Sequence, residues 1–507
     1  MKDLLAWAQA EGASFPKLAY PVLFPPGYIG SQATADILPN EAIVTIPRRL
    51  LFIATLADES PFGHLMSKHP ELFDPGEHSW SEDFRLIALL LYELRKGADS
   101  FWHPFLESLP RDVDTLMKWS SAELEELQDG ILTNDVQQKA CEAEACWQQL
   151  RSVLLEDAAC FSPEMLTFDL FSWANDIVCT RAFGTSTGSN ALSPVAELLN
   201  HNAVHTYHLY GPVDRVKPRV FSEDDGDSLP YDSASVWPVS YRILARLVAM
   251  TEGLAEDTAQ QLLSTATLYD DERYARLQAV SWKPVEFEDT HDFVFRILTG
   301  PTETYSAGAE LYLCYGAESN RHLLLHYGFS LPVDCYNYEY IFVAASELMT
   351  EQQKACADAN DLGEVWCFKV REREICMQMV RTVRALLWRK AVHSPEAAFL
   401  PRDWALEQRT LEICVEILRS SLELYPTTVS QDEALLGSAA SPRLLFALRY
   451  RTQRKRALHT QISLLTTLLS ALPLLKTDTT SHFRALDYPP LQLTFEGMLQ
   501  PYLREVA

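Results

Sequence analysis

The sequence predicts an α+β fold in which a β-rich region is interrupted twice and is then followed by helices. Two observations carry this prediction. Short apolar runs bounded by Pro, Gly and Asn recur in separate segments, and stretches of helical periodicity lie between and after them. The chain has 507 residues, which is too long for one hydrophobic core, so we expect several domains.

The first β-rich segment covers residues 1–53. It opens with a short amphipathic helix, after which apolar runs such as 42–46 stand between turn formers that include Pro39 and Pro47. Residues 54–167 are expected to form a helical insert, since apolar side chains recur there on one face of a helix. The clearest set is Phe84, Ile87, Leu91 and Leu94.

Strands are expected to return around 172–210 and 291–329, inside a segment that spans 168–333. The insertion 211–290 separates them and carries the acidic run 223–227. We interpret this insertion as a surface loop with some helix. The alternative is an acidic flap that selects basic substrates.

Residues 334–507 are expected to form an all-α domain, with apolar positions such as Leu444, Leu448 and Leu458 at helical spacing. The same segment carries a basic cluster, interpreted as a solvated helix face and not as a nucleic-acid patch. Its members are Arg449, Arg451, Arg454, Lys455 and Arg456.

The charge of the chain restricts its partners. Asp and Glu total 69 against 43 Lys and Arg, a formal net charge of −26. No surplus of cations is available to release counterions from nucleic acid, so we expect no nucleic-acid partner. Surplus carboxylates instead favour a basic protein partner.

Cysteine usage and hydropathy indicate the compartment. The ten cysteines are sparse, and none stands in a Cys-x-x-Cys pair, so we expect reduced thiols and no disulfide framework. The N-terminus does not resemble a signal peptide, and the apolar segment 462–475 is too short to span a bilayer. We therefore expect a soluble protein of the cytoplasm or nucleus that acts as a monomer and contacts no membrane.

Three polar clusters stand among apolar residues. The first, Gly27 to Gly30, precedes a predicted strand, where glycine lets the backbone approach a ligand closely. The second is Asn200-His201, whose amide and imidazole can serve one ligand. His201, His205 and His208 also raise the question of a zinc site, but the intervening residues favour a strand, which would scatter the three rings over both faces. We expect no metal.

The third cluster is the densest and runs from Tyr305 to Phe329. Strand alternation puts Leu311, Leu313 and Tyr315 on one face, so Tyr315 ends a buried run with its hydroxyl at the edge of the sheet. Taken alone, such a tyrosine is more often a core residue than a catalytic one.

Together these segments resemble a SET-domain methyltransferase, in the branch typified by the Rubisco large-subunit lysine methyltransferase, which also includes an actin-histidine methyltransferase. The matching stretches are GYIGSQATADILPNEAIVTIPRRLLF, FWHPFLESLP, FSWANDIVCTRAF, ELLNHN, YLCYGAESNRHLLLHYGF and YPTTVSQDEALLGSAASPRLLFALRYR. The resemblance implies a SET domain split by a helical insert and followed by a substrate-binding domain.

The resemblance also implies the chemistry and its residues. A methyl group would pass from S-adenosyl-L-methionine to a protein side chain, and Tyr315 would be the catalytic residue. The implied cofactor-binding residues are Gly30, Tyr28, Thr180, Arg181, Asn200, His201, Tyr327 and Phe329. Thr180, Arg181, Glu197 and Tyr315 would line the substrate channel.

This chain departs from the family where Gly-x-Gly is usual, since Tyr28 replaces the first glycine. The first hypothesis is a protein-lysine N-methyltransferase that acts on a non-histone protein. Histidine is the alternative acceptor, because acceptor choice depends on channel shape. A non-catalytic SET-fold binding module is the other alternative, and the altered Tyr28 position motivates it.

Overall fold

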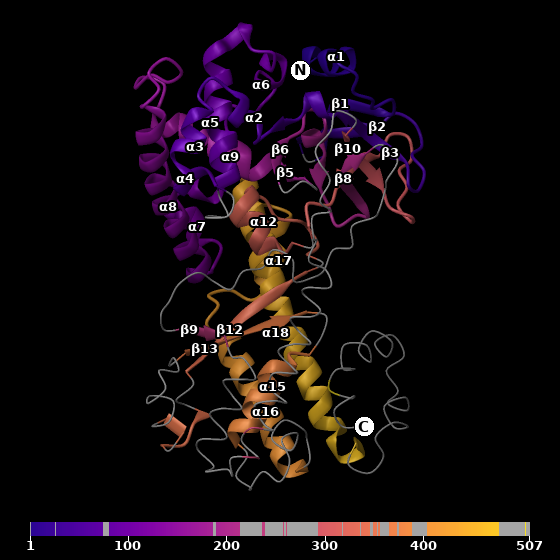
Figure 1. Cartoon of the computed structure of the whole chain (residues 1–507). Coiled ribbons are helices and arrows are strands. Elements are labelled where there is room, and N and C mark those ends of the chain that lie inside the picture. Colours follow the sequence, from indigo (N-terminus) through magenta and orange to yellow (C-terminus); the bar gives the residue numbers. More distant parts are fainter. Residues whose placement is uncertain are drawn as a thin grey trace.

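The structure is a computed structural model of the whole chain (Figure 1). It describes residues 2–25, 27–74, 81–185, 189–212, 236–238, 293–316, 318–334, 336–344, 348–351, 353–354, 365–372, 375–387 and 403–475, with single positions 257, 260 and 502. The acidic run 223–227 therefore lies outside the described residues.

Helices and strands come in successive runs along the chain. The helices are α1 Lys2–Ala10, α2 Leu56–Glu59, α3 His64–Lys68, α4 Pro70–Phe73, α5 Ser81–Lys96, α6 His103–Leu106, α7 Ser121–Glu125, α8 Gly130–Leu154, α9 Phe168–Arg181, α12 Asn320–Tyr327, α15 Met377–Leu387, α16 Trp404–Glu423, α17 Val429–Leu436 and α18 Pro442–Leu475. The strands are β1 Leu18–Phe24, β2 Tyr28–Ala33, β3 Ala42–Pro47, β4 Phe52–Ile53, β5 Ala182–Gly184, β6 Asn190–Leu192, β7 Asn200–His201, β8 Thr206–Pro212, β9 Val236–Pro238, β10 Phe293–Thr299, β11 Glu310–Leu313, β12 Tyr338–Ala344 and β13 Val365–Arg371.

Three small sheets form the β-rich part of the fold, with strand orders β1-β2-β11-β7, β3-β10-β8 and β4-β6-β5. Strand β11 is central in the first sheet, because it pairs antiparallel with β2 and parallel with β7. Three segments that are far apart in the sequence therefore meet at one place, and this crossing positions the candidate site.

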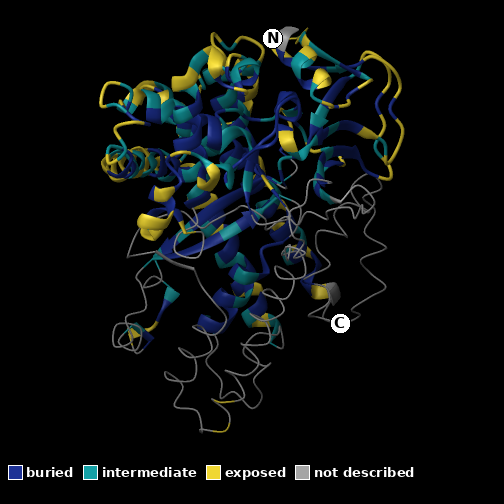
Figure 2. Cartoon of the chain, turned by 45° about the horizontal axis from the view of Figure 1, so that its top comes forward, coloured by how far each residue is buried: buried dark blue, intermediate teal, exposed yellow. Residues whose placement is uncertain are grey.

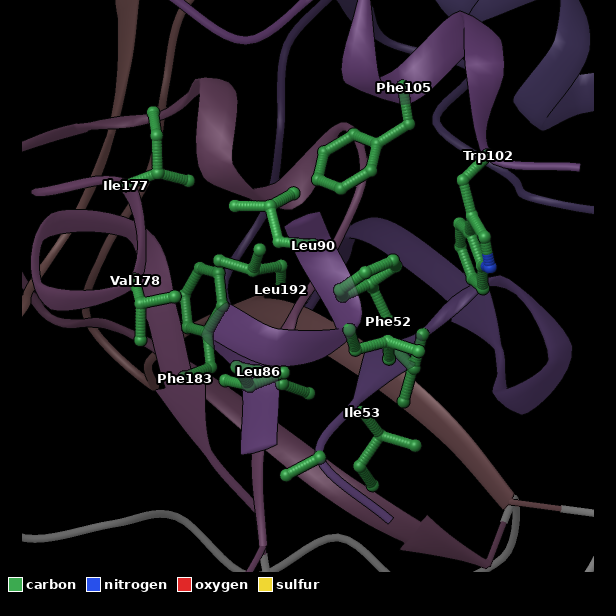
Figure 3. Close-up of a cluster of buried hydrophobic side chains, with 14 of the residues drawn as sticks. Phe52, Ile53, Leu86, Leu90, Trp102, Phe105, Ile177, Val178, Phe183 and Leu192 are labelled. Carbon is green, nitrogen blue, oxygen red and sulfur yellow. The ribbon is translucent and has the colours of Figure 1, made fainter. Parts of the chain in front are cut away.

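Helices α2 to α9 cover one side of these sheets (Figure 1). The predicted apolar face of α5 is confirmed, since Phe84, Ile87 and Leu91 are all buried. Figure 3 shows how α5, α9 and the short strands share one core. The side chains labelled there are Phe52, Ile53, Leu86, Leu90, Trp102, Phe105, Ile177, Val178, Phe183 and Leu192.

One boundary in this region was predicted wrongly. Strands were expected from about residue 172, but α9 continues to Arg181. The hydroxyl of Thr167 accepts a hydrogen bond from the Leu170 N–H and caps the helix. Phe171, Ala174 and Ile177 then bury one helical face. The apolar residues of this stretch thus follow the helical period, although their density suggested strands.

The C-terminal part contains a second core, built on α15, α16 and α18 (Figure 1). The α+β class is confirmed, but this part is not all-α, because β12 and β13 pair antiparallel at its start. Side chains of a strand alternate between two faces, a period of two. This period was not detected in the sequence of β12 and β13, because helical patterns surround these short strands. Strand β9, from the insertion 211–290, pairs in parallel with β13.

Helix α18 connects the two parts and runs from the sheets down to α15 and α16 (Figure 1). The basic cluster on it was expected to be a solvated face, and this is wrong for three of its members. Arg451, Arg454 and Lys455 are buried, and each is ion-paired: Arg451 and Lys455 with Asp432, and Arg454 with Asp129. Charged side chains are fully buried only when they are paired, and here opposite charges come from other elements.

Asp129 shows how this network joins the helical insert to the C-terminal part. One of its carboxylate oxygens caps α8 by accepting the N–H groups of Ile131 and Leu132, both at 3.0 Å. The other accepts the hydroxyl of Tyr450 at 2.6 Å and lies 2.8 Å from Arg454. The start of α8 is thereby fixed to α18.

Burial is greatest where the sheets meet the helices, and exposed positions lie mainly on outer loops and helix faces (Figure 2). The eight described cysteines are all free thiols. Among the described helices, none combines the length and the apolar character that crossing a membrane requires.

Candidate functional site

A cavity opens where the C-terminal end of α9 meets the residues after β11. Six of the residues that line it are Thr180, Arg181, Glu197, Leu199, Tyr315 and Tyr327. Four of the lining residues come from the predicted substrate channel: Thr180, Arg181, Glu197 and Tyr315. The fold therefore brings the whole predicted channel set to one cavity.

The hydroxyl of Tyr315 is held at the cavity wall. It donates a hydrogen bond to the Leu199 carbonyl oxygen at 3.0 Å. Burial raises the pKa of Tyr315 to about 12, an effect that the nearby charge of Arg181 opposes and that of Glu197 reinforces. The phenol is therefore neutral near pH 7, and its oxygen keeps lone pairs for a further contact.

Glu197 and Arg181 form the only charged pair at this wall among the residues that the structure describes as lining it. The Arg181 Nη1 atom lies 3.5 Å from Glu197 Oε2, which is long for a charge-assisted hydrogen bond, and Oε2 has no hydrogen-bond partner in the described structure. Burial raises the pKa of Glu197, and Arg181 partly offsets this effect. A buried, loosely paired carboxyl group beside a cavity is typical of a functional site.

Four predicted cofactor residues and the catalytic candidate share an aromatic cluster or lie beside it. The ring of His201 packs against Tyr315 with centroids 4.9 Å apart, and Tyr327 packs on the same tyrosine at 5.1 Å. Phe329 lies 6.2 Å from both His201 and Tyr327. Asn200 precedes His201 on β7. The aromatic rings thus exclude water from one side of Tyr315.

His201 also fixes the backbone at Tyr315. Its Nδ1 atom accepts the Tyr315 N–H at 3.0 Å, which requires that this nitrogen carry no proton. Burial lowers the pKa of His201 to about 4, so the imidazole is neutral near pH 7. Of the predicted Asn-His pair, His201 therefore acts on Tyr315 through a ring contact and through a hydrogen bond.

The remaining predicted residues gather in a polar cluster on the β2-β11-β7 strands. The Asn200 amide nitrogen donates to the Ile29 carbonyl oxygen at 3.0 Å and to Glu310 Oε1 at 2.9 Å. The hydroxyl of Tyr28 donates to Glu310 Oε2 at 2.6 Å. A Cβ atom on Gly30 would lie 2.5 Å from Glu310 Oε1, so only glycine leaves room for this carboxylate.

Thr180 differs from the other channel residues, because its hydroxyl already donates to the Asp176 carbonyl oxygen at 2.6 Å within α9. Three residues that lie within the motif-bearing segments, but to which the sequence assigned no role, belong to the site. The Leu199 carbonyl oxygen accepts the Tyr315 hydroxyl, while Glu310 and Tyr312 complete the polar cluster. The spacing of Glu310 and Tyr312, two residues apart on a strand that leads to Tyr315, was the available signal.

The three histidines considered as metal ligands lie on or beside β7 and β8, as the predicted strand requires. Within the described residues, no group of three or more His, Cys, Asp or Glu side chains is arranged to hold a metal ion.

Known proteins with similar sequences include protein methyltransferases. The family model described as Rubisco LSMT substrate-binding matches residues 345–458. The chain is 24% identical over 480 residues to the chloroplastic fructose-bisphosphate aldolase-lysine N-methyltransferase of Arabidopsis thaliana, a match that covers 90% of this chain and 81% of the relative. It is 29% identical over 216 residues to the actin-histidine N-methyltransferase of Canis lupus familiaris, covering 39% of this chain and 34% of the relative.

Solved structures agree with these matches. The crystal structure of the SET domain of LSMT bound to lysine and AdoHcy aligns with 97% of this chain and 95% of its own, with a TM-score of 0.58 at 21% identity. LSMT bound to AdoMet aligns with a TM-score of 0.57 at 20% identity, covering 96% of each chain. The resemblance to the Rubisco-methyltransferase branch of SET-domain proteins is confirmed, and the fold is that of LSMT.

The expected location in the cytoplasm or nucleus is contradicted by these matches. The aldolase-lysine methyltransferase and the Rubisco large-subunit methyltransferases of Pisum sativum and Nicotiana tabacum are chloroplastic enzymes. Cysteine usage reports a reducing compartment without saying which one, so it could not separate these locations.

Proposed function

We propose that the chain is an S-adenosyl-L-methionine-dependent protein-lysine N-methyltransferase that acts on a non-histone protein. One observation carries the proposal: Tyr315 stands at the wall of a cavity, with the Arg181–Glu197 pair beside it and Asn200-His201 behind it. The fold of LSMT and the lysine-methyltransferase relatives support the same reaction.

The residues present fit S-adenosyl-L-methionine. The two amide hydrogens of Asn200 are both used within the protein, and its Oδ1 has no partner among the described residues, so it can accept a hydrogen bond from the cofactor's ammonium group. Gly30, on the adjoining strand β2, has no side chain and so leaves room for the Glu310 carboxylate that holds the Asn200 amide. Tyr28, Asn200, His201, Tyr327 and Phe329 would surround the cofactor, which when bound supplies an electrophilic methyl group on a sulfonium.

The side chains at the cavity would prepare the acceptor nitrogen. Free lysine has a pKa of about 10.4, so a nucleophilic amine requires an environment that disfavours the ammonium ion. The buried ring of His201 and the half-buried ring of Tyr327 provide this through desolvation. The positive charge of Arg181 adds repulsion, which Glu197 opposes. Tyr315, whose O–H is committed to Leu199, can accept a hydrogen bond from the amine and orient its lone pair.

Further assignments complete the proposal. Residues 1–53 and 168–333 would form the SET domain, 54–167 its helical insert and 334–507 the substrate-binding domain. The substrate would be basic, because the chain carries a formal charge of −26. The protein would act as a monomer inside the plastid, without nucleic-acid or membrane partners.

Radiolabelled methyl transfer tests this function directly. The purified chain is incubated with methyl-labelled S-adenosyl-L-methionine and a plastid extract, and mass spectrometry then identifies the labelled residue. Methyl-lysine on a protein, formed about 100-fold more slowly by the Tyr315→Phe variant, is the expected result. No transfer to any extract protein by a preparation that binds the cofactor would contradict it and would favour a binding module.

Histidine is the second candidate acceptor, and the actin-histidine methyltransferase relatives favour it. Imidazole is largely neutral near pH 7, so a histidine acceptor would need less help from Arg181. The same mass-spectrometric experiment separates the two, because the modified residue is read directly.

A further inference from the structure

The resemblance noted in the sequence places Tyr28 where a SET-domain protein would have the first glycine of a Gly-x-Gly pair. A side chain here has two opposite consequences. It either obstructs the cofactor cleft, as a degenerate enzyme would, or it contributes a contact that glycine cannot make. Its hydrogen bonds distinguish these readings.

The Tyr28 hydroxyl is hydrogen-bonded to the Glu310 carboxylate. It donates to Oε2 at 2.6 Å, and the hydroxyl of Tyr312 donates to the same oxygen at 2.6 Å. The two hydroxyl oxygens are 3.4 Å apart. Glu310 is 8% exposed, so its negative charge depends on donors from the protein in place of water. Hydrogen bonds to an ionised acceptor are the stronger kind.

The other oxygen of Glu310 holds Asn200. Glu310 Oε1 accepts the Asn200 amide at 2.9 Å, and the Ile29 carbonyl oxygen accepts the same amide at 3.0 Å. The Asn200 side chain therefore cannot exchange its nitrogen and its oxygen without losing two hydrogen bonds. This leaves Oδ1 as the atom offered to a ligand.

The strands explain how these groups meet. Tyr312 on β11 is paired with Asn200 on β7, and β2 runs along the opposite side of β11. Tyr28 and Gly30 are two residues apart on β2 and so face the same side. Gly30 leaves the space that Glu310 fills, and Tyr28 closes one side of that space.

We propose that Tyr28 is a positioning residue, which acts through Glu310 to orient the Asn200 amide for S-adenosyl-L-methionine. This proposal rests on the proposed function. It means that Tyr28 supports cofactor binding, although a tyrosine in place of glycine had suggested that the cofactor cleft is obstructed. Burial and the hydrogen bond to Glu310 raise the pKa of Tyr28, so its hydroxyl remains a donor at neutral pH.

Calorimetric titration of S-adenosyl-L-methionine tests the proposal with two variants. Tyr28→Phe removes the hydroxyl and keeps the ring, and we expect about five- to tenfold weaker binding, as for one lost hydrogen bond to a charged group. Tyr28→Gly restores the usual glycine and should weaken binding at least as much. If Tyr28→Gly binds tighter than the wild type, or if Tyr28→Phe binds equally well, the proposal is overturned.

A double-mutant cycle tests the route through Glu310. In a Glu310→Leu background, which removes both side-chain oxygens, Tyr28→Phe should change cofactor affinity by less than about twofold, because the acceptor of the Tyr28 hydroxyl is gone. Full additivity of the two effects would exclude coupling through Glu310 and overturn the proposal. The Tyr92→Phe variant, altered on α5 within the helical insert, is the matched control and should bind like the wild type.

Thermal unfolding and steady-state kinetics separate positioning from general damage. The Tyr28→Phe variant should keep the wild-type unfolding temperature and kcat, with only the KM for S-adenosyl-L-methionine raised. A wild-type chain that fails to bind the cofactor at millimolar concentration would instead refute the proposed function. Wild-type binding with an unchanged Tyr28→Phe affinity would refute the positioning role alone.

Discussion

Two buried polar regions of this chain differ in how closely their charges are paired. On α18, Arg451 and Lys455 both lie within 3.0 Å of the Asp432 carboxylate, and none of these side chains is more than 3% exposed. At the cavity, Arg181 and Glu197 are 3.5 Å apart, and the carboxylate oxygen has no hydrogen bond within the described structure.

We interpret the first region as a structural charge network and the second as a pair that serves a ligand. Close pairing satisfies each buried charge and fixes the elements that supply it, here α17 and α18 of the C-terminal part. Loose pairing beside a cavity leaves hydrogen-bonding capacity for a ligand and shifts pKa values. Only the basic cluster on α18 was visible as a charged cluster in the sequence, and burial alone would not distinguish the two regions.

The largest effect is expected from breaking the structural network. Asp432→Asn removes the charge that two buried cations share, so the free energy of unfolding should fall by roughly 3 to 5 kcal/mol, as for other broken buried pairs. Denaturant titration measures it. Glu433→Gln, next along α17, breaks only the partly exposed pair with Arg456 and should leave the midpoint nearly unchanged. Equal losses of unfolding free energy in the two variants would show that the close pairing of the buried charges does not contribute to stability.

Acid should affect the site through His201. Burial lowers its native pKa to about 4, whereas the unfolded value is about 6.5. Below pH 6.5 the unfolded chain binds a proton that the native chain does not, so stability is lost as the pH falls from about 6.5 to about 4. One group contributes up to about 3 kcal/mol over this window.

Unfolding of the wild type and of His201→Gln, measured at several pH values, isolates this contribution, because the other titrating groups cancel in the difference. The wild-type advantage should shrink toward pH 4. A pH-independent difference would show that His201 is not held neutral by its surroundings.

Removing the Tyr315 hydroxyl should affect the reaction far more than the fold. We expect Tyr315→Phe to lower kcat about 100-fold, the effect of losing one positioned hydrogen-bonding group at a reacting centre, while the Kd for S-adenosyl-L-methionine changes less than about twofold. Rapid-quench methyl transfer and calorimetry measure the two quantities. Equal losses in both would assign Tyr315 to cofactor binding and not to the acceptor.

The smallest effect is expected at Gly30. In Gly30→Ala, the new Cβ would lie 2.5 Å from Glu310 Oε1 and 2.9 Å from the Asn200 amide nitrogen, so both must shift. We expect about fivefold weaker cofactor binding, roughly 1 kcal/mol. Gly437→Ala is the control, since its Cβ would meet nothing within 4 Å. Similar losses in both would remove the reason for glycine at position 30.

Much of the site was predictable, because its parts follow strand and helix ends that short motifs mark. Tyr315 lies two residues after the end of β11, and the Asn200-His201 pair forms the parallel neighbour of that strand. The residues that escaped prediction act through backbone or through a remote strand. The Leu199 carbonyl carries no sequence signal, and the role of Glu310 depends on Tyr28, which lies 282 residues away.

The fold was predictable to the level of its class and less so in its C-terminal part. The apolar face of α5 could be predicted from the helical spacing of its apolar residues. Strands β12 and β13 pair with each other, but the segment 345–364 separates them in the sequence and interrupts the strand pattern. The burial of Lys455 could not be predicted from the sequence either, because its partner Asp432 comes from another helix. The sequence around a lysine does not show whether its ammonium group contacts water or a carboxylate.

Binding of S-adenosyl-L-methionine to the purified wild-type chain, alongside Asn200→Ala, tests the functional assignment of the cavity most directly. Calorimetry should show one site per chain for the wild type and at least tenfold weaker binding for Asn200→Ala, whose unfolding temperature should remain close to that of the wild type. No heat of binding from the wild type at millimolar cofactor, or equal affinity in the two proteins, would contradict the assignment.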